Sequence, residues 1–560
     1  MEKIWLASYP ANVPHEIAET SIASLVEVLE DAMTRYQKRD AFCYLGKTLR
    51  FGEVEIQSRA VAAWLQSRGL GLGKRVAIMS PNVLSYPAIL IGIVRAGCTL
   101  VSVNPLYTPR ELEHQLNDSG AEAIFIFENF AATLDAVTCP ALRHVVVSSS
   151  GDLLGFPKQT VVNFVVRKIR KMVPAWRLPG HVRLATVMAQ GARLPFQRVR
   201  PGPNDIAMLQ YTGGTTGISK GAMLLHRNVV ANVLQIEAWV SPELKAGDMP
   251  KFVCALPLYH IFALTFCGLV GMRLGACNLL IPNPRDIPGM IKVLRTFRFS
   301  VFPAVNTLFN ALVSHPDFAG LDFSALRISI GGGMAVQSAV AERWLKVTGK
   351  PLLEGYGLSE TSPVASCCPP DRQEYTGSIG LPVPSTEFSI RDDSGAECEP
   401  GVAGEICIRG PQVMAGYWNR PEETAQAMTD DGFFRSGDIG IMDARGEVRI
   451  VDRKKDMILV SGFNVYPAEV EEVVTQHPGV LECVAVGVPD AHSGEAVRIF
   501  VVRRDPGLSE ADVRAWCRDK LTGYKRPTVV TFRTELPKSP VGKVLRRVLR
   551  SESQPERAAA

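Results

Sequence analysis

The sequence has no long hydrophobic run of the kind that crosses a membrane. Its longest apolar stretch, residues 261–272, is interrupted by Gly268 and followed by Arg273, whereas a spanning helix needs about 20 consecutive apolar residues. The start of the chain contains Glu2 and Glu16 and has no apolar core, so it does not resemble a secretory signal peptide. We therefore expect a soluble, cytoplasmic protein.

Cysteine and histidine patterns typical of metal sites are also missing. The twelve cysteines are scattered, and only Cys367 and Cys368 lie close together in the sequence. Without C-x-x-C pairs or a secretory context, we expect reduced core thiols rather than disulfides or zinc ligands. The nine histidines show no H-E-x-x-H spacing, so the sequence does not predict a catalytic zinc site.

The chain carries little excess of either charge. Lys and Arg number 61 against 56 Asp and Glu, which leaves a net charge of +5 over 560 residues. This excess is too small to indicate nucleic-acid binding. With 46% apolar and 21% charged residues, the composition excludes disordered and fibrous classes and suits roughly three or four globular units.

Short apolar runs alternate with helical patterns through most of the chain. Residues 75–79, 123–127 and 145–148 predict buried strands, and residues 110–117 predict a helix that ends near Gly120. This alternation favours an α/β fold with parallel sheet.

A further strand, glycine turn and helix follow in the middle of the chain. Residues 327–330 predict the strand, Gly331, Gly332 and Gly333 the turn, and residues 335–347 the helix. This unit again has the order expected of an α/β domain.

Beyond about residue 452 the elements become shorter and more closely spaced. The patterns predict a helix over 467–476, strands over 483–488 and 498–502, and a helix over 510–520 after the capping residue Ser509. We therefore expect two parts. Residues 1–452 would form a large α/β part with several subdomains and parallel or mixed sheets, and residues 453–560 a small α+β domain.

The densest chemical signal is a loop rich in glycine and threonine. Residues 211–221 read Tyr-Thr-Gly-Gly-Thr-Thr-Gly-Ile-Ser-Lys-Gly and follow the strand-like residues 206–210. Backbone N–H groups and hydroxyls of such a loop can donate to polyphosphate, and Lys220 would add positive charge. Ser219 stands where a P-loop needs glycine, so this is a different phosphate loop. The alternative is a polar surface turn.

With this loop and several further blocks, the sequence resembles the acyl-adenylate-forming superfamily, and within it the bacterial long-chain fatty-acid–CoA ligases. The resemblance extends from Ile4 to Lys543 and rests on several blocks in the same order. These blocks are residues 104–110, 211–221, 256–260, 355–360, 377–384, 431–455 and 536–547. The resemblance implies that ATP, Mg²⁺ and coenzyme A are used to convert a fatty acid to acyl-CoA through acyl-AMP, with release of pyrophosphate and AMP.

The resemblance also implies a nucleotide site. The three glycines with Tyr356 would enclose the adenine, and Asp438 would accept both ribose hydroxyls, with Arg453 beside it. Considered alone, these residues also fit plain turns and a solvated linker. The implied nucleotide-binding residues are Thr212, Gly213, Gly214, Thr215, Thr216, Gly217, Gly331, Gly332, Gly333, Gly355, Tyr356, Gly357, Ser359, Asp438 and Arg453.

Three sequence positions differ from the family's usual residues. Ser359 replaces a threonine and keeps the hydroxyl, while Phe433 and Ser436 replace the usual tryptophan and threonine. The last two changes bear on chain length and leave adenylation unaffected, so the sequence does not predict an acyl-chain preference. Glu360, beside Ser359, is the implied Mg²⁺ ligand because a carboxylate suits this hard ion. Its alternative is a solvated surface acid.

The implied catalytic residues are Lys543, His260 and Lys220. Gly542 allows a sharp loop that projects Lys543 away from its own domain, and the resemblance places its ammonium against the acyl carboxylate and the α-phosphate. The alternative is one more surface cation in a basic tail. His260 would lie near the acyl group, and its alternative is a buried core histidine.

The family carries out its two half-reactions by rotating the small C-terminal domain, which is therefore expected to be mobile. Lys455 falls at the implied hinge, although the charged run around it also fits a solvated linker. After rotation, Gly462 and Phe463 would face the coenzyme A site. The base that deprotonates the coenzyme A thiol does not follow from the sequence.

A basic amphipathic pattern covers residues 161–173. Val162, Val165, Val166, Ile169, Met172 and Val173 would share one helical face, opposite Arg167, Lys168, Arg170 and Lys171 and with Phe164 off the stripe. Such a helix can lie on an anionic inner-membrane surface, or it can dock on its own core with a solvated basic face. A homodimer is a further candidate state.

Two other classes of function stay open at this point. One is an adenylating enzyme that delivers medium-chain or other carboxylates to coenzyme A or a carrier protein, or oxidises the acyl-adenylate. The other is a membrane-bound fatty-acid-binding protein without catalysis. Dependence of AMP release on free coenzyme A separates the first class, and ATP–pyrophosphate exchange separates the second.

Overall fold

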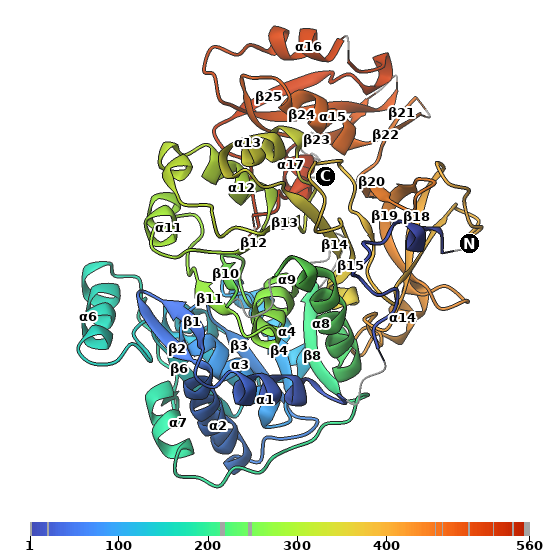
Figure 1. Ribbon diagram of the computed structural model, residues 1–560. Helices are drawn as coiled ribbons and strands as arrows, with labels where there is room; N and C mark the ends of the chain where they lie inside the picture. Colours follow the sequence, from blue (N-terminus) through green and yellow to red (C-terminus); the bar gives the residue numbers. More distant parts are fainter. Residues whose placement is uncertain are drawn as a thin grey trace, which may run out of the picture.

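The computed structural model describes residues 3–18, 22–212, 219–244, 249–453, 455–461, 463–490, 493–518, 520–539 and 542–553. Within these ranges the strands form four sheets, and Figure 1 shows the C-terminal sheet above the other three. No helix of these ranges has both the length and the apolar character needed to cross a membrane. The predicted α/β class is confirmed.

The first large sheet carries the strands on either side of the phosphate loop. Its order is β7 (Val182–Arg183), β6 (His144–Ser148), β5 (Ala123–Phe127), β3 (Arg75–Met79), β4 (Thr99–Ser102), β8 (Ile206–Thr212) and β9 (Lys220–Leu225). Neighbouring strands are parallel except for β8 and β9, which are antiparallel. The predicted parallel strands are therefore confirmed.

Helix α4 (Pro109–Ser119) shows how local sequence sets an element in this layer. Thr108 and Glu111 form a capping box, in which the Thr108 hydroxyl accepts from the Glu111 N–H at 3.4 Å and the Glu111 carboxylate accepts from the Thr108 N–H at 2.8 Å. Gly120 ends the helix in the left-handed conformation. The predicted stop near Gly120 is confirmed.

The second large sheet carries the glycine turn. Its order is β16 (Leu381–Pro382), β15 (Val364–Cys367), β14 (Leu353–Gly357), β13 (Ile328–Gly332), β12 (Val301–Ala304), β10 (Lys251–Cys254), β11 (Cys277–Leu280), β1 (Asp40–Tyr44) and β2 (Lys47–Arg50). Helix α13 (Ser338–Thr348) begins three residues later than predicted. The cause is that Val336 and Gln337 donate their N–H groups to the side chains of Glu354 and Asn306, which keeps this segment out of the helix.

Helices pack against both large sheets. The other helices of this part are α1 (Leu25–Arg35), α2 (Phe51–Ser67), α3 (Ser85–Arg95), α5 (Ala131–Asp135), α6 (Lys158–Phe164), α7 (Leu184–Gly191), α8 (His226–Val240), α9 (Ile261–Ala263), α10 (Gly271–Arg273), α11 (Ile287–Leu294) and α12 (Asn306–Val313). One hydrophobic cluster extends from Trp5 to Val448 and joins these layers. A second cluster includes Ala77, Ile124 and Leu209, which lie on strands of the first large sheet.

An antiparallel four-stranded sheet follows, at the right of Figure 1. It consists of β17 (Glu387–Arg391), β18 (Ala403–Arg409), β19 (Phe434–Met442) and β20 (Val448–Arg453), with α14 (Pro421–Ala427) between β18 and β19. Phe388, Ile406 and Val448 of this sheet belong to the large N-terminal cluster, so the sheet is continuous with that core.

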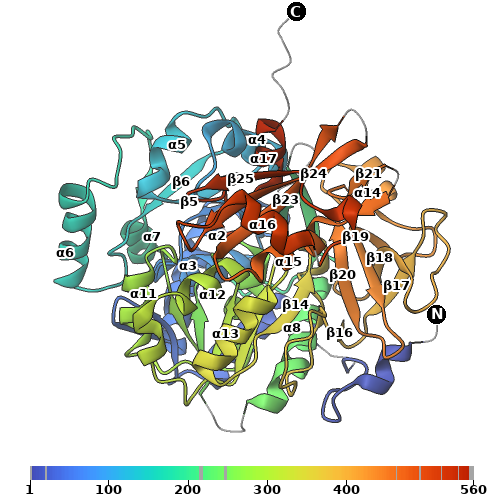
Figure 2. The same cartoon turned by 90° about the horizontal axis from the view of Figure 1, so that it is seen from above.

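The C-terminal sheet has the order β22 (Phe463–Val465), β21 (Ile458–Val460), β24 (Gly494–Arg503) and β23 (Val480–Asp490), with β25 (Val529–Arg533) also beside β24. Its helices are α15 (Pro467–Thr475), α16 (Glu510–Arg518) and α17 (Arg546–Glu552). Strands β23 and β24 are longer than predicted because they pair along their full length, polar ends included. Figure 2 shows this layer over the middle of the molecule. The division into 1–452 and 453–560 stays a prediction.

Candidate functional site

A cavity of about 980 Å³ lies where the second large sheet, the four-stranded sheet and the C-terminal layer meet. Most of the predicted site residues that the structure describes line it. These are Thr212, His260, Gly332, Gly333, Gly355, Tyr356, Gly357, Ser359, Glu360, Asp438, Arg453, Lys455 and Lys543. Of the other predicted residues, Gly331, Lys220 and Phe463 do not line the cavity. Gly213, Gly214, Thr215, Thr216, Gly217 and Gly462 lie outside the described residues.

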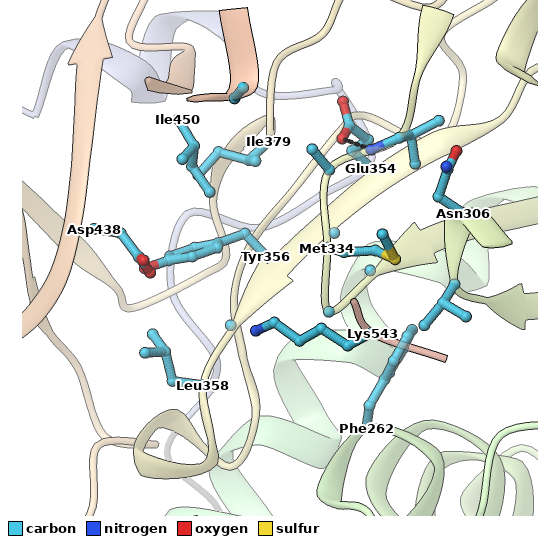
Figure 3. Close-up of a pocket in the computed structure, with 18 of the residues that line it drawn as sticks. Phe262, Asn306, Met334, Glu354, Tyr356, Leu358, Ile379, Asp438, Ile450 and Lys543 are labelled. Carbon is cyan, nitrogen blue, oxygen red and sulfur yellow. Dashed lines mark hydrogen bonds between the residues drawn. The ribbon is translucent and has the colours of Figure 1, made fainter. Parts of the chain in front are cut away.

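One wall of the cavity is held together by hydrogen bonds among three side chains. The Tyr356 hydroxyl on β14 donates to Asp438 Oδ2 on β19 at 2.7 Å, as Figure 3 shows. The Arg453 guanidinium at the end of β20 lies 3.2 Å from the other carboxylate oxygen of Asp438, because Asp438 and Arg453 are partners across the two strands. Burial raises the pKa of Tyr356 well above its ordinary value, so the phenol stays a donor. An aromatic face beside a carboxylate suits a flat base with ribose hydroxyls.

Glu360 stands at the end of β14, in the short turn Ser359–Thr361. Its carboxylate is 8% exposed and accepts a hydrogen bond of 2.8 Å from the Tyr417 hydroxyl. Burial raises the pKa of Glu360. Among the described residues, no three His, Cys, Asp or Glu side chains gather as a metal cage. A single carboxylate nevertheless fits Mg²⁺, which takes one or two protein carboxylates and fills its other positions with phosphate oxygens and water.

Lys543 enters the cavity from the C-terminal layer. Its N–H donates to Ser539 Oγ at 3.1 Å, and its carbonyl accepts from the Ser539 N–H at 2.7 Å. Gly542 has a φ of +84°, and a Cβ there would lie 2.7 Å from Thr307 Oγ1, so this turn needs glycine. The Thr307 hydroxyl on α12 donates to the Gly542 carbonyl at 3.1 Å. These bonds direct the lysine side chain into the space below Tyr356 (Figure 3).

The Lys543 ammonium loses its proton near neutral pH. Burial, together with the cationic Arg453, lowers the pKa of Lys543 to about 7, against the opposing effect of Asp438. An ammonium in such a place gains most when further negative charge arrives, because the low-dielectric surroundings strengthen the attraction. The lysine is therefore suited to neutralise an anion that forms or binds beside it.

The cavity continues into an apolar wall beside His260. The imidazole Nδ1 accepts from the Phe262 N–H at 3.3 Å, and burial, with a smaller contribution from Lys543, lowers the pKa of His260 to about 4. The imidazole is thus neutral at pH 7. The apolar side chains that line this part are Ile236, Trp239, Val240, Leu256, Ile261, Phe262, Phe266, Val305, Ile330 and Met334.

Lys220 stands apart from the cavity. Thr212 and Lys220 are partners across β8 and β9, and the Ser219 hydroxyl donates to the Thr212 carbonyl at 2.7 Å. The Lys220 ammonium forms an ion pair with Glu423 on α14 and lies 5.3 Å from the centre of the Tyr417 ring. The structure therefore places this lysine beside Tyr417, the hydrogen-bond partner of Glu360, and outside the lining of the cavity.

The two remaining predicted positions lie in the C-terminal part. Lys455 lines the cavity, and burial lowers its pKa. Phe463 is 56% exposed and stacks on Tyr524 with ring centres 4.7 Å apart. Across the expected hinge, the Ala468 N–H donates to Asp452 Oδ2 at 2.9 Å.

Sequence reasoning missed several residues of this site. Tyr417, Glu423 and Thr307 carry no motif of their own, and no local signal points to them. Glu354 is different: it directly precedes the Gly355 motif on β14, which is a signal of its position. Its carboxylate accepts from the Val336 N–H at 2.9 Å (Figure 3), and burial raises the pKa of Glu354 to about 8, so this cavity carboxyl is mostly protonated at pH 7.

Comparison with known proteins identifies relatives along the full length. Residues 29–418 match the AMP-binding enzyme family, and residues 469–543 match the AMP-binding enzyme C-terminal domain. A long-chain-fatty-acid–CoA ligase from Escherichia coli O157:H7 is 55% identical over 557 residues, which cover 99% of both chains. A protein of the same name from Bacillus subtilis (strain 168) is 37% identical over 556 residues, covering 98% of both chains.

A solved structure supports the same assignment. The crystal structure of ATP-bound MatB from Rhodopseudomonas palustris superposes with a TM-score of 0.77 at 27% identity, covering 94% of this chain and 98% of that chain. The chain belongs to the AMP-binding enzyme family, among its bacterial long-chain-fatty-acid–CoA ligases.

Proposed function

We propose that this cavity activates long-chain fatty acids in two steps. ATP and the fatty acid first give acyl-AMP and pyrophosphate, and coenzyme A then displaces AMP to give acyl-CoA. The observation that carries the proposal is the meeting of Lys543, the Tyr356–Asp438 pair and Glu360 on one cavity that has an apolar wall. The names of the relatives supply the substrate class.

The first step needs charge neutralisation more than proton transfer. A fatty acid is ionised at neutral pH, since carboxyl pKa values are near ~4, so its oxygen attacks the α-phosphorus without a general base. The difficulty is the approach of one anion to another while pyrophosphate leaves. The Lys543 ammonium faces this point, and Lys220 with the hydroxyls of the phosphate loop would hold the leaving phosphates. When bound on Glu360, Mg²⁺ adds positive charge to the phosphate oxygens.

The nucleotide would be held by residues that both steps share. The glycines at 331–333 and the Tyr356 ring would enclose the adenine, and Asp438 would accept the ribose hydroxyls while Arg453 holds its carboxylate in place. The neutral His260 lines the same cavity as the apolar wall and is close enough to Lys543 to be affected by its charge, so it would guide the acyl carboxylate. These roles rest on geometry and family resemblance together.

The second step would need another arrangement of the C-terminal domain. Lys543 occupies the cavity, whereas Phe463 lies on an exposed face, so the two cannot serve one carbonyl at once. Rotation of residues 453–560 about Lys455 would remove the lysine and bring the face with Gly462 and Phe463 to the acyl-AMP.

The experiment that tests this function is ATP–pyrophosphate exchange with fatty acids of increasing chain length. We expect exchange that depends on a long-chain acid, and AMP release that depends on free coenzyme A. Exchange with short acids alone would show that the substrate is not a long-chain acid. AMP release that needs a carrier protein instead of coenzyme A would show that the acceptor is different. Absence of any exchange would remove the adenylation proposal.

We also propose that the chain collects its substrate at an anionic inner-membrane surface through the region around α6. Helix α6 and the π-helical segment Val165–Ile169 that continues it lie at the periphery in both overall views (Figures 1 and 2). Five large apolar side chains in and around it are at least half exposed: Phe156, Val161, Phe164, Ile169 and Met172. Lys168, Arg170 and Lys171 are exposed beside them, and each basic residue near such a surface contributes about 1 kcal/mol.

The structure changes two details of the predicted amphipathic helix. Arg167 is not part of a free basic face, because its guanidinium binds Glu128 at 2.8 Å and that carboxylate is buried. Phe164 lies off the predicted apolar stripe yet is 57% exposed, whereas Val162 packs against the core. The membrane surface is therefore best defined by Phe156, Ile169 and their exposed neighbours.

Flotation with vesicles of phosphatidylglycerol and phosphatidylcholine tests this surface. We expect reversal of Lys168, Arg170 and Lys171 to glutamate to abolish flotation, while the matched reversal of Lys292, Arg295 and Lys346, which are exposed elsewhere, leaves it unchanged. Equal binding of both triple variants would contradict the proposal. The expected homodimer stays a prediction, which sedimentation velocity would check.

A further inference from the structure

A short segment after β18 connects Glu360 to β9, the strand that follows the phosphate loop. We call residues 414–418 the bridging segment. Its Met414 N–H donates to the Glu360 carbonyl at 2.8 Å, which ties it to the turn that carries the metal carboxylate. Three further backbone bonds tie it to β9: Ala415 N–H to Met223 O at 3.0 Å, Met223 N–H to Gly416 O at 2.8 Å, and Trp418 N–H to Gly221 O at 2.8 Å.

The Tyr417 side chain of this segment contacts two site residues. Its hydroxyl donates to Glu360 Oε1 at 2.8 Å, and the centre of its ring lies 5.3 Å from the Lys220 ammonium. One side chain thus contacts an acid and a base that come from different sheets.

The backbone of Tyr417 is fixed as well. Gly416 has a φ of +141°, and a Cβ there would lie 2.6 Å from Thr424 Cγ2, so the turn before the tyrosine needs glycine. The Thr424 hydroxyl on α14 accepts the Tyr417 N–H at 2.9 Å. Glu423, the neighbour of Thr424, forms an ion pair with the same Lys220 ammonium. The ring therefore has one position relative to both partners.

We propose that Tyr417 is a positioning residue that couples the two charged groups: its hydroxyl fixes the Glu360 carboxylate for Mg²⁺, and its ring holds the Lys220 ammonium beside the phosphate loop. This inference rests on the proposed roles of Glu360 and Lys220. A carboxylate that is already hydrogen-bonded on one oxygen keeps the other oxygen directed, which preserves the geometry that a metal ligand needs. A cation above a ring face is held without losing its charge.

The two contacts can be separated by substitution. Tyr417→Phe removes the hydroxyl and keeps the ring, whereas Tyr417→Leu removes both. The readouts are equilibrium binding of Mn²⁺, followed by electron paramagnetic resonance with a non-hydrolysable ATP analogue, and binding of the same analogue in EDTA, followed by calorimetry. Neither readout depends on turnover. Thermal unfolding of each variant checks that it is folded.

Tyr417→Phe tests the hydroxyl. We expect Mn²⁺ affinity to fall about tenfold, the size typical for loss of a hydrogen bond to a charged group, while binding in EDTA changes by less than about twofold. The matched control is Trp418→Phe, which removes the 3.0 Å bond from the indole to the Asp118 carbonyl in the same segment and should leave both affinities unchanged. Unchanged Mn²⁺ affinity in Tyr417→Phe, or an equal loss in both assays, would overturn the proposal.

Tyr417→Leu tests the ring. We expect analogue binding in EDTA to weaken about threefold because the lysine loses its support. In the Tyr417→Leu background, Lys220→Ala should then add less than it does in the native chain. Additive effects would overturn the ring's role. Failure of the proposed function would look different: the native enzyme would bind the analogue yet show no fatty-acid-dependent pyrophosphate exchange.

Discussion

The two sides of the cavity are built in different ways. The wall with Tyr356, Asp438 and Glu360 stands on strands whose hydrophobic neighbours belong to the cluster that extends from Trp5 to Val448. Lys543 opposes it from a layer whose two hydrophobic clusters contain only residues between 458 and 549. The nucleotide wall therefore shares the main core, and the lysine is supported by cores of its own.

Few polar contacts hold the lysine side against the wall side. Among the described residues, the Thr307–Gly542 and Ala468–Asp452 bonds are joined by the Asn310 amide, which donates to the Leu481 carbonyl at 3.3 Å, and by the Ser338 hydroxyl, which donates to Glu472. Separate cores joined by a few polar contacts are typical of domains that move relative to each other. The difference suggests that the wall serves both half-reactions, whereas the lysine serves only the arrangement described above.

The largest expected effect separates the two half-reactions. Two unit charges ~4 Å apart at an effective dielectric of ~20 interact by ~4 kcal/mol, which corresponds to roughly a thousandfold in rate. We therefore expect Lys543→Ala to lower acyl-AMP formation about a thousandfold and to leave conversion of supplied acyl-AMP and coenzyme A unchanged. The measurements are the rate of pyrophosphate release and the rate of thioester formation.

The control for this prediction comes from the same tail. Arg547 on α17 is exposed, so Arg547→Ala should affect neither step. Arg550 is a poorer control because it lies 3.7 Å from Asp456, close to the expected hinge. Equal loss of both half-reactions in Lys543→Ala would show that the lysine has a structural role.

The wall should respond in the opposite pattern. Asp438→Asn removes the charge that faces Arg453 and the ribose site, and a hydrogen bond to a charged group is worth about 1.5–3 kcal/mol. We expect both half-reactions to slow by a similar factor, about 10–100-fold at low nucleotide concentration. Asp430→Ala, an exposed acid nearby in sequence, is the control. If Asp438→Asn slowed one step alone, the wall would not be common to both.

A smaller effect should follow from weakening the contact between the two sides. Thr307→Val removes the hydroxyl that bonds the Gly542 carbonyl, at a cost of about 1 kcal/mol or fivefold in rate. Adenylation should slow by this factor while thioester formation keeps its rate. Thr296→Val removes an exposed hydroxyl bond on the surface and should change neither. Slower thioester formation in Thr307→Val would contradict the proposed division.

The smallest expected effect is a proton taken up when nucleotide binds. With a pKa of about 7, Lys543 is half neutral at pH 7, and the phosphate charges of MgATP raise its pKa. Uptake should therefore be about half a proton at pH 7, nearly one at pH 9 and close to none at pH 5.5. Calorimetry in buffers of different ionisation enthalpy measures it, as the difference between the native enzyme and Lys543→Ala. No difference would mean that Lys543 is already charged before binding.

Sequence motifs indicate most of the cavity's lining but not the contacts between distant segments. Tyr356 and Glu360 lie near the end of β14 and just beyond it, where a locally encoded buried run stops. Asp438 lies within β19, and its place in the site follows from the family resemblance. Tyr417 and Thr307 were missed because their roles depend on partners far away in the sequence, Glu360 and Gly542. The late start of α13 has the same origin, since Glu354 and Asn306 capture the N–H groups of Val336 and Gln337.

The proposed movement of Lys543 can be tested most directly by locking it in place. The Ser338 hydroxyl donates to Glu472 across the two sides, so Ser338→Cys with Glu472→Cys places two thiols at this contact. A short bis-methanethiosulfonate reagent joins them through disulfides, and the joined protein is the oxidised form. Ten of the twelve native cysteines are buried, and Cys43 and Cys139 are half-buried, which limits competing disulfides. The reduced form of the same double variant is the reference.

We predict that the oxidised form makes acyl-AMP at the reduced form's rate but does not transfer the acyl group to coenzyme A until a reductant is added. Acyl-CoA formation at equal rates in both forms would contradict the account.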